Sequence, residues 1–111
     1  MTEWIKVGSL DDIPIKGARK VATQRGTVAV FRCSDDAVFA LLDRCPHKAG
    51  PLSEGIVHGH RVTCPLHNWV IELEDGNAVA PDVGCAPKLA VRVEDGVIWL
   101  QAEAAQNPAA A

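Results

Sequence analysis

Two cysteines and two histidines form a pair of short motifs in the middle of this chain, and these motifs constrain its fold more than any other feature. Residues 45–47 read Cys-Pro-His and residues 64–67 read Cys-Pro-Leu-His, with sixteen residues between His47 and Cys64. Proline and glycine surround both motifs, which is the composition of tight loops. A thiolate and an imidazole on each of two loops can all point at one buried metal centre. The candidate ligands are Cys45, His47, Cys64 and His67.

This ligand set is compatible with two kinds of metal centre. Two cysteines and two histidines can close a tetrahedral zinc site. They can also hold a [2Fe–2S] cluster in which histidines replace cysteines on one of the two irons. Zinc fingers usually pair cysteine with cysteine and histidine with histidine, because each arm binds one ion. Here each arm carries one residue of each type, which favours the cluster and leaves zinc as the alternative.

The spacing C-x-H followed by C-x-x-H resembles the signature of the Rieske [2Fe–2S] family. The resemblance implies that Cys45 and Cys64 bind the inner iron, and that His47 and His67 bind the outer iron. It also implies a Rieske-type antiparallel β-sandwich whose two ligand loops form a cluster-binding tip. Residues 84–89, Gly-Cys-Ala-Pro-Lys-Leu, resemble the third loop of that family, which covers the cluster from the side.

The rest of the chain has the pattern of short strands separated by turns, so an all-β fold is expected. Strands are predicted at residues 4–7, 19–23, 27–33, 37–42, 55–57, 61–63, 69–73, 89–93 and 97–101. Gln24-Arg-Gly and Glu94-Asp-Gly are hairpin signals. One domain at residues 1–102 is large enough to bury about 65% of the surface that its unfolded chain exposes. Residues 103–111 lack large apolar side chains and are expected to form a flexible tail.

Several residues outside the ligand set have simpler interpretations. Cys33 ends an apolar strand and is expected to be a buried free thiol. Cys85 is expected near the cluster without being a ligand, and a Cys33–Cys85 disulfide is the alternative. Trp4 and Trp99 are expected in the core. Trp69, two residues past His67, is expected to shield the cluster, although packing alone would explain a tryptophan there.

Two further histidines, His58 and His60, flank Gly59 in a predicted turn. Metal binding there would need partners that the sequence does not reveal. Both are therefore interpreted as ordinary surface histidines.

Composition excludes several functional classes. The net charge is −3 and no basic stripe occurs, which argues against nucleic-acid binding. No apolar run approaches the ~20 residues of a membrane span, and no signal-peptide pattern opens the chain, so a cytoplasmic location is expected. No nucleophile with its base and no phosphate-binding glycine loop is evident. The chain alone is therefore expected to carry electrons and to have no substrate site.

The loops also differ from those of the Rieske proteins of cytochrome bc complexes. Those proteins place an additional disulfide at the positions of Gly50 and Leu66, and serine and tyrosine donors at the positions of Trp69 and Ile71. Hydrogen bonds to sulfur stabilise the reduced cluster, so their loss lowers its potential. The sequence therefore indicates a low-potential, ferredoxin-like carrier.

The sequence of the loops resembles one family of electron carriers in particular. Lys48, Asn68-Trp69 and Gly84-Cys85 resemble the small subunit of assimilatory NAD(P)H-dependent nitrite reductase, which converts nitrite to ammonia. That resemblance implies a large partner subunit carrying flavin, sirohaem and an iron–sulfur centre. One alternative is the ferredoxin component of an aromatic-ring dioxygenase system. The other is a non-redox structural module with zinc or no metal.

A docking surface for such a partner is expected around the outer-iron histidines. Short apolar side chains surround both motifs there, and close approach of a partner is the expected consequence. The residues expected on this surface are Pro46, Pro51, Leu52, Pro65 and Leu66.

Overall fold

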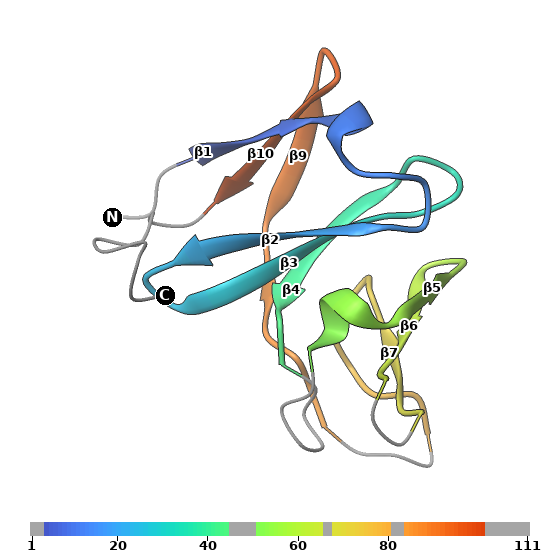
Figure 1. The fold of residues 1–111 in the computed structure, drawn as a ribbon. Coiled ribbons are helices and arrows are strands. Elements are labelled where there is room, and N and C mark those ends of the chain that lie inside the picture. Colours follow the sequence, from blue (N-terminus) through green and yellow to red (C-terminus); the bar gives the residue numbers. More distant parts are fainter. Residues whose placement is uncertain (1–3, 45–50, 66–67, 81–83, 102–111) are drawn as a thin grey trace.

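The chain folds almost entirely into antiparallel strands (Figure 1). The computed structural model describes residues 4–44, 51–65, 68–80 and 84–101. Its strands are β1 (Trp4–Ser9), β2 (Ala18–Thr23), β3 (Gly26–Arg32), β4 (Val38–Leu42), β5 (Ile56–His58), β6 (Arg61–Thr63), β7 (Val70–Glu72), β8 (Lys88–Leu89), β9 (Val91–Glu94) and β10 (Val97–Gln101). Two short 3-10 helices, η1 (Leu10–Asp12) and η2 (Leu52–Glu54), complete the described elements. The predicted all-β fold class is confirmed.

The strands form three sheets with the orders β1-β10-β9, β2-β3-β4-β8 and β5-β6-β7. Figure 1 shows β2, β3 and β4 between the other two sheets. We call β5, β6, β7 and η2 together the loop-bearing lobe, because the predicted ligand loops adjoin these elements. The β1-β10-β9 sheet and the central sheet, β2-β3-β4-β8, therefore form a sandwich. The β5-β6-β7 sheet packs against the other face of the central sheet.

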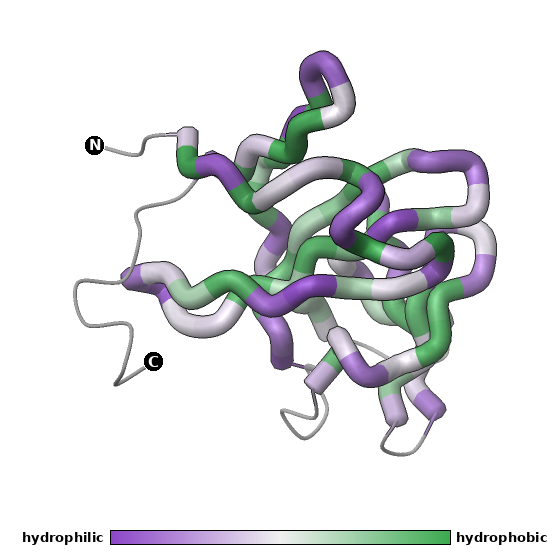
Figure 2. The backbone as a smooth tube through the Cα atoms, turned by 45° about the horizontal axis from the view of Figure 1, so that its top comes forward, coloured by the Kyte–Doolittle hydropathy of each residue, from purple (hydrophilic) through white to green (hydrophobic). Residues whose placement is uncertain are grey.

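Strand β3 holds this arrangement together because both of its faces are buried. Val28 and Val30 pack in one hydrophobic cluster with side chains of β1 and β10. Ala29 and Phe31 pack in a second cluster with side chains of β5, β6 and β7. Successive side chains of a strand point to opposite faces, so a strand covered on both sides needs a continuous apolar run. Figure 2 shows the hydrophobic segments concentrated in the interior strands and hydrophilic segments at the outer turns.

Both predicted hairpins are present. In the first, Thr23 pairs with Gly26 across the β2–β3 turn. In the second, Glu94 pairs with Val97 across the β9–β10 turn. The two central residues of that second turn, Asp95 and Gly96, have φ angles of 52° and 76°. Asp-Gly is favoured in such a turn because both positions require positive φ.

The single strand predicted at residues 89–93 is wrong, because the chain changes sheets there. β8 pairs with β4, whereas β9 pairs with β10. Ala90 lies between them, and its carbonyl oxygen accepts a hydrogen bond of 2.9 Å from the N–H of Gln101. An apolar pattern records which side chains are buried and carries no information on which strand is the partner.

The prediction of Trp4 and Trp99 as core residues is also wrong. Both are half-buried. β10 instead buries Ile98 and Leu100, so Trp99 lies on the opposite face of its strand. The guanidinium carbon of Arg92 lies 4.4 Å from the centroid of the Trp4 ring, a cation–π contact that covers this ring at the surface.

Candidate metal-cluster site

The second ligand motif begins between β6 and β7, which pair as an antiparallel hairpin. Cys64 follows β6 directly, and its side chain is completely buried. Its backbone N–H donates a 2.7 Å hydrogen bond to the carbonyl oxygen of Trp69, next to the Thr63–Val70 strand pair. Trp69 is half-buried and packs against the hydrophobic cluster that contains Cys64. Both ends of this loop are therefore anchored in the core.

The first ligand loop is anchored by Asp43, which follows β4. Its Oδ1 accepts the backbone N–H of Ser53 at 2.7 Å, and its Oδ2 accepts the Ser53 hydroxyl, also at 2.7 Å. The backbone N–H of Asp43 donates to the carbonyl oxygen of Thr27 at 2.9 Å. Residues 43 and 53 flank the loop, so one largely buried carboxylate joins its two ends. The sequence analysis missed Asp43, although a carboxylate directly after an apolar strand is a signal that could have found it.

The described ends of the two loops lie in the same hydrophobic cluster. Leu52, just after the first loop, and Cys64, at the start of the second, belong to the same buried cluster. Of the four predicted ligands only Cys64 lies within the described residues, and Cys45, His47 and His67 lie outside them. Leu52 is completely buried, so its predicted place on a docking surface is wrong. Pro65 is exposed, as that prediction requires.

The segment predicted as a third loop connects the lobe to the central sheet. The N–H of Ala78 donates to the carbonyl oxygen of Gly84, and the N–H of Ala86 donates to that of Gly76, both at 2.8 Å. The carbonyl oxygen of Pro87 accepts a 2.9 Å hydrogen bond from the N–H of Leu42, the last residue of β4. The segment thus begins beside the β6–β7 hairpin and ends where the first ligand loop departs.

The cysteines outside the ligand motifs are free thiols. Cys33 is completely buried, as predicted, and Cys85 is exposed. The alternative of a Cys33–Cys85 disulfide is therefore wrong. Whether Cys85 lies near the cluster depends on ligands outside the described residues, so that placement stays a prediction.

His58 ends β5 and His60 lies in the β5–β6 turn, close to the expected turn, but their surroundings differ. The Nε2 of His58 lies 2.7 Å from the Thr63 hydroxyl. The Nδ1 of His60 lies 3.0 Å from Glu74 Oε2, and its Nε2 lies 2.8 Å from Asp35 Oδ2. Hydrogen bonds to the carboxylates of Glu74 and Asp35 raise the pKa of His60 above its ordinary value. The sequence did not reveal these partners, which lie 14 and 25 residues away in the chain.

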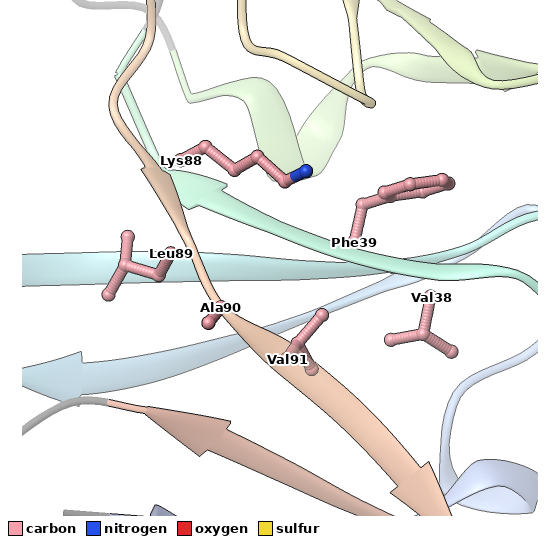
Figure 3. A pocket seen from close by; sticks show the side chains of 6 residues that line it. All are labelled: Val38, Phe39, Lys88, Leu89, Ala90 and Val91. Atoms are coloured by element: carbon pink, nitrogen blue, oxygen red, sulfur yellow. The ribbon is translucent and has the colours of Figure 1, made fainter.

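A pocket of about 430 Å³ lies where β4 passes β8 and β9 (Figure 3). β8 pairs with β4 only at Ala40 and Leu41, which leaves the first part of β4 to line the pocket. The lining residues are Val38, Phe39, Lys88, Leu89, Ala90 and Val91. Five apolar side chains and one lysine offer no acid–base pair for catalysis.

The donor set and its burial fit an iron–sulfur cluster. The thiol of Cys64 is held out of water at the end of a strand, and it shares a buried cluster with the end of the other ligand loop.

Among the described residues, no helix is long and apolar enough to cross a membrane.

Comparison with protein families gives one assignment. Residues 3–101 match the family described as the Rieske-like [2Fe–2S] domain. The anthranilate 1,2-dioxygenase ferredoxin subunit of Burkholderia cepacia is 40% identical over 88 residues, which cover 78% of this chain and 75% of that protein. Several longer proteins also match, and the chain spans between 16% and 24% of their lengths.

Comparison with solved structures supports the same fold. A protein described as an NADH-dependent nitrite reductase small subunit from Mycobacterium tuberculosis superposes with a TM-score of 0.81 at 26% identity, covering 95% of this chain and 99% of that one. The carbazole 1,9a-dioxygenase ferredoxin of Nocardioides aromaticivorans has the same TM-score at 23% identity, covering 90% and 98%. The chain belongs to the Rieske-like [2Fe–2S] domain family, and its cofactor is a Rieske-type [2Fe–2S] cluster.

Proposed function

We propose that Cys45 and Cys64 bind the inner iron of the cluster and that His47 and His67 bind the outer iron. The burial of Cys64, and the place of the described ends of both loops in the same hydrophobic cluster, support this assignment. When bound, the cluster supplies one-electron redox chemistry. The residues of this chain then exclude water from the sulfur side and hold the loops by Asp43 and the Cys64–Trp69 hydrogen bond.

The chain would serve as the small, electron-transferring subunit of an NAD(P)H-dependent assimilatory nitrite reductase. The observation that carries this proposal is the near end-to-end correspondence with a protein described as such a subunit, covering 95% of this chain and 99% of that one. Two residues that resemble those of that subunit, Asn68 and Trp69, also have structural roles here. Asn68 adopts a φ of 58° at the hairpin tip, and Trp69 closes the loop onto Cys64.

A second candidate is the ferredoxin of an aromatic-ring dioxygenase system. The 40% identity to the anthranilate dioxygenase ferredoxin subunit favours it, because it exceeds the 26% identity to the nitrite reductase small subunit. Both candidates use the same chemistry in this chain and differ only in the partner. The family assignment disfavours the third alternative, a module without a redox role.

Partner reconstitution separates the two candidates. The purified red-brown holoprotein would be combined in turn with the sirohaem-containing large subunit and with a terminal dioxygenase plus its reductase, all from the source organism. We expect NAD(P)H-dependent nitrite consumption that requires this chain and is lost with Cys64→Ser. Support of aromatic-ring oxidation without support of nitrite reduction would overturn the nitrite reductase assignment in favour of the second candidate.

A further inference from the structure

A second group of side chains that could hold a metal ion lies among the described residues, outside the proposed cluster ligands. Cys33 follows β3, Asp35 lies in the β3–β4 turn and His60 lies in the β5–β6 turn. One ligand atom from each of these residues lies within 4.8 Å of the other two. They supply one sulfur, one oxygen and one nitrogen, from two turns that are far apart in the sequence.

The thiol of Cys33 is placed unusually for a residue of the hydrophobic core. Its exposed fraction is 0%, yet it approaches both a carboxylate and an imidazole. Burial first, and the negative charges of Asp35 and Glu74 next, raise the pKa of this thiol to about 11. A divalent cation reverses this balance, because a coordinating thiol loses its proton to the metal.

His60 is oriented as metal-bound histidines usually are. Its Nδ1 lies 3.0 Å from Glu74 Oε2, which leaves Nε2 directed at Asp35. A carboxylate on the second ring nitrogen fixes the tautomer and orientation of a ligating histidine and raises its basicity. The ring also packs 5.1 Å from that of Phe39, measured between centroids.

The local charge favours a cation. Asp35 and Glu74 both contact His60, and among the described residues neither carboxylate forms an ion pair with lysine or arginine. Lys88 is a cationic group close to this site: its Nζ donates to the backbone carbonyl oxygen of Glu74 and lies over the Phe39 ring. Two carboxylates therefore face one histidine and one thiol.

We propose that Cys33, Asp35 and His60 bind one Zn²⁺ ion, with Glu74 as a positioning residue on His60. Thiolate, imidazole and carboxylate are the ligands that zinc takes in proteins, at about 2.3, 2.0 and 2.0–2.2 Å. Asp35 is exposed, so the fourth position of a tetrahedral site faces solvent and takes a water. Zinc binding would bring the three ligand atoms closer together, and the exposed turn that carries Asp35 would move to allow this.

Such an ion would join two parts of the fold. Cys33 and Asp35 belong to the connection between β3 and β4 of the central sheet, whereas His60 belongs to the loop-bearing lobe. Zinc would therefore fasten the lobe to the central sheet at a place that shares no residue with the proposed cluster ligands.

The test is zinc titration of the iron-loaded holoprotein by isothermal calorimetry, with the visible spectrum recorded throughout. We expect one Zn²⁺ per chain at micromolar or tighter affinity, without loss of the cluster spectrum. Asp35→Asn and His60→Asn should weaken binding at least tenfold, and Glu74→Gln should weaken it by about 10- to 100-fold. Asp35→Asn retains the side-chain oxygen that accepts the N–H of Ala37, so the turn is preserved.

Matched controls come from the same chain. His58→Asn removes the neighbouring histidine at the end of β5, and Cys85→Ser removes the exposed thiol; neither should change zinc affinity. X-ray absorption at the zinc edge should show one sulfur neighbour, which is lost in Cys33→Ala. Binding weaker than millimolar, an equal affinity in His60→Asn, or zinc uptake that bleaches the iron–sulfur spectrum would each overturn the proposal.

Discussion

Asp43 is the residue whose side chain closes the first ligand loop. Asp43→Ala removes two 2.7 Å hydrogen bonds to Ser53, one of which satisfies a backbone N–H. Hydrogen bonds to a charged group are worth about 1.5–3 kcal/mol each, and water replaces part of the loss, so we expect the free energy of unfolding to fall by about 2–3 kcal/mol. Urea denaturation measures this change. Asp11→Ala, at an exposed position, is the control and should stay within about 0.5 kcal/mol of wild type; an equal effect of both changes would contradict the role of Asp43.

The two cysteines outside the ligand motifs should differ strongly in reactivity. The thiolate is the reactive form, and the pKa of Cys33 is raised from 9.0 to about 11 by burial first and by Asp35 and Glu74 next. At pH 8 in chelator-treated buffer, we expect iodoacetamide to label Cys85 in the native protein. Cys33 should react about 100-fold or more slowly than it does in urea, because two pKa units remove that fraction of thiolate. Peptide mass spectrometry measures both rates, and rapid native labelling of Cys33 would refute its burial.

The cluster potential is set by residues beside the ligands. Ile71 stands where bc-type Rieske proteins have a tyrosine donor, and it is completely buried in β7 with no polar side-chain atom. Without that donor the reduced cluster is less stabilised, so we expect a midpoint potential toward the low end of the Rieske range of roughly −150 to +300 mV. Protein-film voltammetry measures it. A value above about +150 mV would show that other donors control the site.

At the scale of single elements, Gly76 is critical in the turn after β7. Its φ is +81°, and a Cβ there would collide with the carbonyl oxygen of Ala86, in the segment that leads back to β4. Gly96 has a similar φ of +76° with open space around it, so Gly96→Ala measures the cost of the backbone conformation alone, about 1–2 kcal/mol. We expect Gly76→Ala to cost about 1–3 kcal/mol more, because it adds the steric clash. Thermal unfolding of both variants measures the difference. Equal losses of stability would show that the segment containing Ala86 moves aside without a further loss of stability.

Some elements of this fold could be predicted from the sequence and others could not, and the reasons are physical. The β2–β3 and β9–β10 hairpins were predictable because turn chemistry is local, as in Asp95-Gly96. The division of residues 89–93 between two sheets was not predictable, because strand partners are chosen by contacts distant in sequence. The same holds for the Asp43–Ser53 contact and for the Asp35–His60–Glu74 group. The ligand motifs were recognisable from spacing alone, whereas the partners that the supporting side chains contact were not.

For the whole molecule, we expect two hydrophobic clusters to keep the fold stable without the metal. One cluster joins the β1-β10-β9 sheet to the central sheet, and the other joins the central sheet to the loop-bearing lobe. We expect Cys64→Ser to abolish visible absorption while the far-ultraviolet circular dichroism keeps its β-type form. Iron analysis and circular dichroism on one preparation test both parts. Full iron content would refute Cys64 as a ligand, and a random-coil spectrum would show that the whole fold needs the cluster.

The hydrogen bond from Leu42 to Pro87 has a consequence for how such proteins diversify. It brings together the two points where the chain leaves the central sheet and returns to it, so residues 43–87 form an insertion with adjacent ends. A relative's insertion could be exchanged at these two points without altering the order of the remaining strands. The exchange has one steric condition: the new insertion must cover Ala29, Phe31 and Leu41, whose side chains would otherwise face water. Redox properties and docking specificity would then change with the exchange of one segment, while the remaining strands keep the hydrophobic cluster that they form among themselves.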